Sequence, residues 1–272
     1  MAIDLAVTGA TGRMGRAVLE VAAGRNDCAV SLAVARDPPE ESIDGITIEP
    51  EDEFEALLVD RSPQVVVDFT APEATVAYAE ACRTASVPIV SGTTGFSDEQ
   101  VDELRSASRE VPVLWASNFS RGIAALRRAV EAAVEALPSY DVEITETHHS
   151  GKLDAPSGTA KTLLEDIERT RSEQARIHPD TDRAHGRVGH APRSPGEIGV
   201  HARRAGDIAG EHEVLLAGNE ETISLTHRAG DRRIFAIGAI DAAVWLVDRE
   251  AGYYGFSDVI DGTTDQERDG RV

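Results

Sequence analysis

The stretch AVTGATGRMGRAV, Ala6–Val18, places Gly9, Gly12 and Gly15 directly after an apolar run. Glycines are needed where a strand turns sharply into a helix and where the backbone must come close to a bound pyrophosphate. The N-terminus of the following helix offers unpaired N–H groups to such an anion. The stretch therefore predicts a dinucleotide-binding turn between a first strand and a first helix, the alternative being a bare tight turn.

The rest of the first half repeats this pattern of strand followed by helix. Apolar runs typical of buried strands begin near residues 3, 29, 64, 88 and 111, and helical patterns separate them. Such alternation is typical of a parallel sheet covered by helices on both faces. We therefore expect an α/β fold with an N-terminal Rossmann-type doubly wound parallel sheet over residues 1–119, joined by a returning C-terminal segment at 239–272.

The pattern changes after Pro138. The run YDVEITETHH alternates, with Val142 and Ile144 on one face, and a helical pattern follows it. Residues 171–195 are polar, contain Gly and Pro, and predict a long loop. Three further strand-like runs, near 197–204, 211–216 and 221–227, are separated by turns that contain Gly. This predicts a smaller α+β domain over residues 120–238 with a mixed or antiparallel open sheet.

The composition is strongly acidic, with a formal net charge of -21 and with Lys152 and Lys161 as the only lysines. Nucleic acid and anionic membranes are disfavoured as partners, because binding to them needs a basic surface. Salt screens self-repulsion of this size, so the charge and the use of Arg in place of Lys indicate adaptation to a salt-rich cytosol. An ordinary acidic protein is the alternative.

The two cysteines and the ends of the sequence indicate a cytoplasmic protein. Cys28 and Cys82 form no CxxC motif or cluster, so we expect two reduced, partly buried thiols and no disulfide framework. The N-terminus shows no signal-peptide pattern. The longest apolar run near the C-terminus, FAIGAIDAAVWLV, contains Asp241 and is too short to span a bilayer.

The end of the predicted second strand, SLAVARDPP, bears on the choice of cofactor. An acidic residue there would bind the adenosine ribose of NAD, whereas an Arg would accept the 2′-phosphate of NADP. Ala35 has no side-chain group to bind the ribose, and Arg36 can bind the 2′-phosphate. Asp37, an acidic residue directly after Arg36, argues in the opposite direction. The run favours NADPH over NADH, and the alternative is that Arg36 and Asp37 are solvated loop charges.

The stretch THHSGKLDAPSGTA gathers residues suited to acid-base chemistry and anion binding. His148 and Lys152 are four apart, a spacing that lets a tight loop bring imidazole and ammonium to one pocket. Strand parity directs His148 and His149 to opposite sides, so we expect no metal site there. Ser157 is a candidate N-cap, and Gly158 and Thr159 would begin a helix whose N-terminus suits a carboxylate. The alternative is a surface turn.

Together these motifs closely resemble the 4-hydroxy-tetrahydrodipicolinate reductase family, also called dihydrodipicolinate reductases. The resemblance extends over nearly the whole chain and rests on GATGRMGR (9–16), DFTAPEA (68–74), SGTTGF (91–96), SNFSRG (117–122), THHSGKLDAPSGTA (147–160) and RRAGDIAGEH (203–212). It implies reduction of 4-hydroxy-tetrahydrodipicolinate, a small dicarboxylate, by NADPH or NADH in diaminopimelate and lysine biosynthesis. Homoserine dehydrogenase and a non-catalytic NADP-sensing protein remain as alternatives.

The resemblance also implies roles for particular residues. His148 and Lys152 would be catalytic, and the substrate would contact His149, Ser157, Gly158 and Thr159. The cofactor would lie against Gly9, Ala10, Thr11, Gly12, Arg13, Met14, Arg36, Gly92, Thr93, Thr94, Ala116, Ser117, Asn118 and Phe119. A homotetramer built through the sheet of the second domain is implied as well, which would make 120–238 a substrate-binding and oligomerisation domain.

Two features depart from the family pattern. Ala35 stands where many members carry an acidic residue, which counts against strong use of NADH. The run RAHGRVGHAPRSPGEIG, residues 183–199, fits the family only loosely, and the sequence assigns it no role.

The acidic composition predicts a dependence on salt. Melting temperature and turnover should both rise as KCl increases from low concentration into the molar range, because counterions screen the repulsion among surface carboxylates. Thermal unfolding and initial rates measured along a KCl series test this. A melting temperature that does not change with salt would contradict the predicted adaptation.

Overall fold

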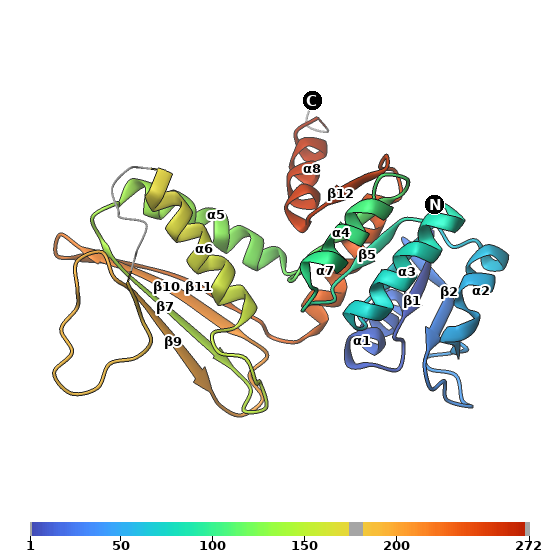
Figure 1. The fold of residues 1–272 in the computed structure, drawn as a ribbon, viewed down its shortest axis with the longest axis horizontal. Helices are drawn as coiled ribbons and strands as arrows, with labels where there is room; N and C mark the ends of the chain where they lie inside the picture. Colours follow the sequence, from blue (N-terminus) through green and yellow to red (C-terminus); the bar gives the residue numbers. More distant parts are fainter. Residues whose placement is uncertain (1, 174–181, 270–272) are drawn as a thin grey trace. The chain divides into compact units, whose positions relative to one another are not determined.

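The computed structural model describes residues 2–173 and 182–269, with side chains to residue 262, and divides into two compact units. Unit 1 comprises Met1–Ser120 and Arg232–Val272, and unit 2 comprises Arg121–Asp231 (Figure 1). Unit 1 is thus assembled from both ends of the chain, and the return to it begins at Arg232. Among the described residues, no helix combines the length and the apolar character that a membrane span requires.

Unit 1 is built on a parallel sheet of seven strands in the order β12-β6-β5-β4-β1-β2-β3. The direction in which the order runs reverses between β1 and β4, which is the arrangement of a doubly wound sheet. This confirms the predicted Rossmann-type fold. The strands are β1 (Ile3–Thr8), β2 (Cys28–Ala35), β3 (Glu49–Pro50), β4 (Val65–Asp68), β5 (Ile89–Ser91), β6 (Pro112–Trp115) and β12 (Gly252–Tyr254).

The helices of unit 1 form two groups around this sheet. α1 packs against α7, and α7 also contacts β4, β5 and β6, whereas α3 lies beside both α2 and α4 (Figure 1). Tyr78, Cys82 and Leu104 bury their side chains in one core with strand residues, and both cysteines are free thiols. The elements are α1 (Arg13–Ala23), the 3-10 helix η1 (Glu51–Glu53), α2 (Phe54–Arg61), α3 (Pro72–Ala85), α4 (Asp98–Ala107), α7 (Arg233–Leu246) and α8 (Phe256–Asp269).

Unit 2 contains a mixed sheet of five strands in the order β11-β10-β7-β9-β8. β7 pairs antiparallel with β10 and parallel with β9, so the predicted mixed sheet is confirmed. Val142, Ile144 and the helices form the core on one face. The elements are α5 (Arg121–Ala136), β7 (Asp141–His148), α6 (Gly158–Glu173), β8 (Arg183–Ala184), β9 (Ile198–Arg204), β10 (Glu211–Gly218) and β11 (Glu221–Arg228).

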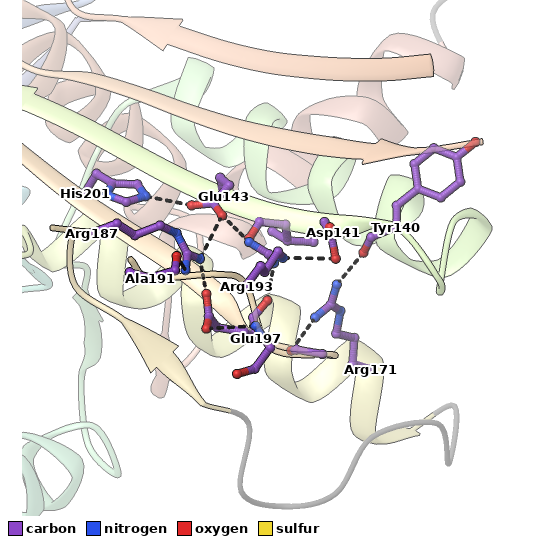
Figure 2. A network of polar contacts seen from close by, with 12 residues as sticks. Tyr140, Asp141, Glu143, Arg171, Arg187, Ala191, Arg193, Glu197 and His201 are labelled. Carbon is purple, nitrogen blue, oxygen red and sulfur yellow. Dashed lines mark hydrogen bonds and ion pairs between the residues drawn. The ribbon is translucent and has the colours of Figure 1, made fainter. Parts of the chain in front are cut away.

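The segment between β8 and β9, which the sequence left without a role, is anchored to the sheet by arginines (Figure 2). Arg193 bonds the carboxylate of Glu143, and Arg187 bonds that of Glu197. The same Glu143 carboxylate lies 2.6 Å from Nε2 of His201. Residues 174–181 of the predicted loop lie outside the described residues, and the remainder includes the end of α6 and the short strand β8.

Arg171, in the last turn of α6, ties the helix to the same region (Figure 2). Its guanidinium donates to the carbonyl oxygens of Tyr140, at 2.8 Å, and Gly196, at 3.3 Å. Burial lowers the pKa of this side chain from its ordinary value. A buried guanidinium bonded to backbone carbonyls holds chain segments that are far apart in the sequence.

Candidate active site

The predicted cofactor residues of unit 1 gather at one edge of its sheet. Parallel strands end at the same edge, and ligands of such sheets bind where the strand order reverses. Gly9–Met14 follows β1, Arg36 follows β2, Gly92–Thr94 follows β5 and Ala116–Phe119 follows β6. The structure therefore brings together segments that lie far apart in the sequence, from Gly9 to Phe119.

The glycine turn fits the requirement for a close backbone approach. Gly9 has φ +63°, a conformation that favours glycine, and its carbonyl oxygen accepts a 2.9 Å hydrogen bond from the N–H of Gly12. A Cβ on Gly15 would lie 2.1 Å from the same oxygen. Gly12 is the N-cap of α1 and makes no side-chain cap, an arrangement that suits the binding of an anion by the first-turn N–H groups.

Arg36 directly follows β2 at this edge. Its side chain is 76% exposed and its Nε is 3.3 Å from Oε1 of Glu51. An exposed pair of this kind adds little stability, so an incoming phosphate can replace Glu51 as the partner of Arg36. Ala35, by contrast, is buried and offers no polar group to a ribose.

The loops after β5 and β6 are closely packed. Trp115 Nε1 donates to the carbonyl oxygen of Thr93 at 2.8 Å, and a Cβ on Gly92 would collide with the ring of Phe69. The side chain of Phe119 is buried and forms edge contacts with Phe69 and with another ring. A cofactor would therefore meet Phe119 through its backbone.

In unit 2, His148 ends β7 and is held by a carboxylate that the sequence reasoning missed. Its Nδ1 lies 2.5 Å from Oε2 of Glu146, which is completely buried. The carboxylate is an acceptor, so Nδ1 carries the proton and Nε2 is left for chemistry. Burial lowers the pKa of His148, the bond to Glu146 opposes this, and the charge of Lys152 lowers it further.

Glu146 has two further partners. Both terminal nitrogens of Arg204 bond its carboxylate, at 2.8 and 2.9 Å, and the backbone N–H of Ser157 donates to Oε1 at 3.1 Å. Burial raises the pKa of Glu146, but the hydrogen bonds from Arg204 and His148 outweigh burial and hold the pKa below its ordinary value. The carboxylate thus joins β7, β9 and the start of α6.

Ser157 caps α6 as predicted, since its Oγ accepts from the N–H of Ala160 at 3.2 Å. The same Oγ is 3.1 Å from Nε2 of His212, and Ser157 is buried. Burial lowers the pKa of His212 to about 4, and the nearby charge of His148 lowers it too. The Ser157 hydroxyl is thus bonded within the protein. At this helix start the residues accessible to solvent are Gly158, which is exposed, and Thr159, which is half-buried.

Lys152 lies in the loop between His148 and α6. Its Nζ is 2.8 Å from Oδ1 of Asp154, and its N–H closes a turn onto the carbonyl oxygen of His149, which is half-buried. The loop is fixed from the other side, because Ala205 N donates to the carbonyl oxygen of His148 at 2.9 Å. An acid-base group and an ammonium thus flank the start of a helix.

Gly210 keeps space beside the free nitrogen of His148. A Cβ there would lie 3.1 Å from His148 Nε2, and Gly210 has φ +157°. His148 itself is only 12% exposed, so even a methyl group would narrow the approach to Nε2. Among the residues that the structure describes, no cluster of His, Cys, Asp or Glu is arranged to hold a metal ion.

Two sequence signals pointed to the missed residues. Glu146 and His148 are two apart on one strand, which places both side chains on the same face. Arg204 and His212 belong to the run RRAGDIAGEH, which carried part of the family resemblance without any role being given to its residues.

Comparisons with known proteins show the family of both units. The sequence model "Dihydrodipicolinate reductase, N-terminus" matches residues 3–119, and "Dihydrodipicolinate reductase, C-terminus" matches 122–260. The chain is 50% identical over 258 residues to 4-hydroxy-tetrahydrodipicolinate reductase of Natronomonas pharaonis, covering 95% of this chain and 100% of the relative. It is 48% identical over 257 residues to that of Haloarcula marismortui, covering 94% and 98%. Both organisms are halophilic archaea, in keeping with the predicted salt adaptation.

Among solved structures, the dipicolinate-bound dihydrodipicolinate reductase from Paenisporosarcina sp. TG-14 has a TM-score of 0.75 and 26% sequence identity. The similarity covers 95% of this chain and 99% of that one. Family models match both halves of the sequence, and close relatives align over nearly their full length. The chain therefore belongs to the dihydrodipicolinate reductase family of NAD(P)H-dependent oxidoreductases.

Proposed function

We propose that this chain reduces 4-hydroxy-tetrahydrodipicolinate, by way of dihydrodipicolinate, to tetrahydrodipicolinate in diaminopimelate and lysine biosynthesis. Family membership over both units supports this, as do the relatives that bear this name. The observation that carries the proposal is the buried Glu146 bonded to Nδ1 of His148 at the start of α6. A rate assay with the condensation product of pyruvate and aspartate semialdehyde, following loss of reduced nicotinamide absorbance, tests it.

His148 is the proton donor in this proposal. A nicotinamide cofactor held by unit 1 would supply the hydride for a conjugated imine of the substrate, and the electron pair displaced from the double bond would need a proton. Nε2 of protonated His148 gives that proton, while Nδ1–H stays bonded to Glu146. The carboxylate stabilises the imidazolium before transfer and fixes the tautomer after it.

Lys152 is the second catalytic side chain in this proposal, since it donates a proton or stabilises charge in the chemical step, and together with the start of α6 it also binds the charged substrate. The two carboxylates of the ring need positive partners, and the ammonium of Lys152 and the first-turn N–H groups at Gly158 and Thr159 supply them, with His149 beside them. A compact ammonium has rotatable donors and can release a proton, whereas an Arg is planar and stays charged. This accounts for Lys152 in a chain whose basic residues, apart from Lys161, are arginines.

The cofactor is assigned to the edge of unit 1. The pyrophosphate would lie on the glycine turn Gly9–Met14, the 2′-phosphate of NADPH on Arg36, and the remainder on the loops Gly92–Thr94 and Ala116–Phe119. The absence of a carboxylate at Ala35 favours NADPH, and the exposed position of Arg36 supports the same choice.

The assembly proposed is a homotetramer in the cytoplasm. The face of the unit 2 sheet opposite its helices supports the tetramer, because it is available for contacts between subunits. Thr145 and Leu215 on that face are only half-buried. The two free cysteines and the acidic composition are suited to a reducing, salt-rich cytosol. Sedimentation of the purified protein in molar KCl measures the tetramer directly.

Replacing the two proposed catalytic side chains should slow the chemical step. His148→Gln and Lys152→Met should each lower kcat by roughly 10²- to 10⁴-fold, the usual worth of general acid-base help. The Kd for NADPH should stay nearly unchanged, because the cofactor loops are in unit 1. Steady-state kinetics and cofactor titration measure the two effects separately.

The other lysine provides the matched control. Lys161→Met, on the exposed side of α6, should keep normal kcat. Lys152→Arg should not restore activity, and a fully active Arg variant would show that charge alone is needed at that position. A normal kcat in both His148→Gln and Lys152→Met would show that residues 148–152 form a surface turn without a catalytic role.

The lowered pKa of His148 predicts a pH profile. Proton donation needs the imidazolium, so kcat/KM should fall as pH rises through the pKa of His148, which burial holds below its ordinary value. Glu146→Gln removes the negative charge that raises the pKa of His148, so the falling limb of the kcat/KM profile should move to lower pH. Rates measured from pH 5 to 9 test this, and a limb that stays in place or moves to higher pH would contradict the role of Glu146.

Arg36 should determine the preference between cofactors. Arg36→Ala should reduce kcat/KM for NADPH far more than for NADH, because only NADPH carries the 2′-phosphate. Arg61→Ala, which removes an exposed arginine of α2 from the same unit, is the control and should change neither value. Equal losses with both cofactors after Arg36→Ala would refute the assignment.

A further inference from the structure

Asp68, the last residue of β4, is 0% exposed, and in the described part of the chain the hydrogen bonds to its side-chain carboxylate all come from hydroxyl groups. Within the described part of the chain, no Arg, Lys or His forms an ion pair with it. A carboxylate buried in this way is costly unless donors surround it. The donors are Thr8 (2.7 Å) and Thr70 (2.6 Å) to Oδ1, and Thr75 (2.6 Å), Ser91 (2.8 Å) and Thr93 (3.0 Å) to Oδ2.

Some of these hydroxyl groups also bond backbone N–H groups, so they link Asp68 to the backbone of two loops. Ser91 Oγ accepts from the N–H of Thr93 at 3.2 Å, and Thr93 Oγ1 accepts from the N–H of Thr70 at 3.0 Å. The main-chain oxygen of Asp68 accepts from the N–H of Gly92 at 2.9 Å. The carboxylate therefore fixes the chain after β4 and the chain after β5 relative to each other.

The same network reaches the glycine turn. Thr8 directly precedes Gly9, and the methyl group of Thr70 lies 2.8 Å from where a Cβ on Gly9 would be. Asp68 thus joins the segments that follow β1, β4 and β5, all at the edge where the candidate cofactor residues gather. Arg36 follows β2, on the other side of the point where the strand order reverses.

Asp68 and Arg36 therefore lie on the sides of the sheet edge that correspond to different halves of a dinucleotide. In a doubly wound sheet the cofactor spans the point where the order reverses, with its adenosine half toward β2 and its nicotinamide half toward β4 and β5. The loops fixed by Asp68 are therefore those on the nicotinamide side. Several oriented hydroxyls around one carboxylate hold such loops in a single arrangement before the ligand arrives.

We propose that Asp68 is a positioning residue for the nicotinamide half of the cofactor, an inference that rests on the proposed function. Asp68 is buried, so it acts through Thr70, Ser91 and Thr93 and not by touching the ligand. A merely structural role would weaken the whole unit and every part of the cofactor site alike. A positioning role weakens binding of the nicotinamide half and spares the adenosine half.

The test compares two ligands on apo protein. NADPH carries both halves, whereas adenosine 2′,5′-bisphosphate carries the adenosine half with the 2′-phosphate but no nicotinamide. Asp68→Asn and Ser91→Ala should each raise the Kd for NADPH by about tenfold or more, the scale of one unsatisfied buried hydrogen-bonding group. The Kd for the bisphosphate should rise far less, because only its 5′-phosphate, on the glycine turn, lies near the Asp68 network. Titration calorimetry measures both without any turnover.

Ser108→Ala is the matched control for Ser91→Ala. Ser108 is also a buried serine of unit 1, and its hydroxyl donates to the carbonyl oxygen of Arg105 at 2.8 Å, at the end of α4. This variant should bind both ligands as the wild type does. If Asp68→Asn does not fold, the pair of serine variants decides the question.

Two results would overturn the assignment of Asp68 while leaving the proposed function intact. One is wild-type affinity for NADPH in both variants, and the other is an equal loss for NADPH and for the bisphosphate. A wild-type protein that binds neither ligand would overturn the proposed function, and the role of Asp68 with it.

Discussion

The buried carboxylate of Glu146 is the constraint on which the candidate site depends. It bonds Nδ1 of His148, the guanidinium of Arg204 and the N–H at the start of α6. Removing one partner would leave a charge in a place where water cannot compensate it. The orientation of the proposed acid, the attachment of the neighbouring strand and the direction of the helix that receives the substrate are therefore linked.

The sequence predicted those features that repeat or that require glycine. Alternation predicted both sheets, and the glycine triad that begins at Gly9 predicted the sharp turn between β1 and α1. Glu146, Arg204 and Asp68 were missed for one physical reason. Apart from close neighbours such as His148, two positions from Glu146, their partners lie far away in the sequence, such as Arg204, 58 positions from Glu146, and only the register of the folded sheets brings these together.

The effect of each charged residue depends on whether it is exposed or buried. Acidic residues spread over the surface repel one another through water and are sensitive to salt, whereas buried pairs are screened much less. The network around Glu143 uses Arg187 and Arg193, and Arg171 reaches backbone carbonyls from the end of α6. Arginine suits these places because its planar group makes several hydrogen bonds of fixed direction.

The discontinuity of unit 1 has a consequence for synthesis on the ribosome. The strands β1 to β6 emerge first, but α7, which packs on β4, β5 and β6, and the edge strand β12 follow only after the whole of unit 2. Unit 2 is contiguous and can close its core while one face of the first sheet still awaits its helix. A chain that ended near residue 231 would thus contain the whole of unit 2 but would lack α7 on the β4, β5 and β6 face of unit 1, which chaperones could then bind.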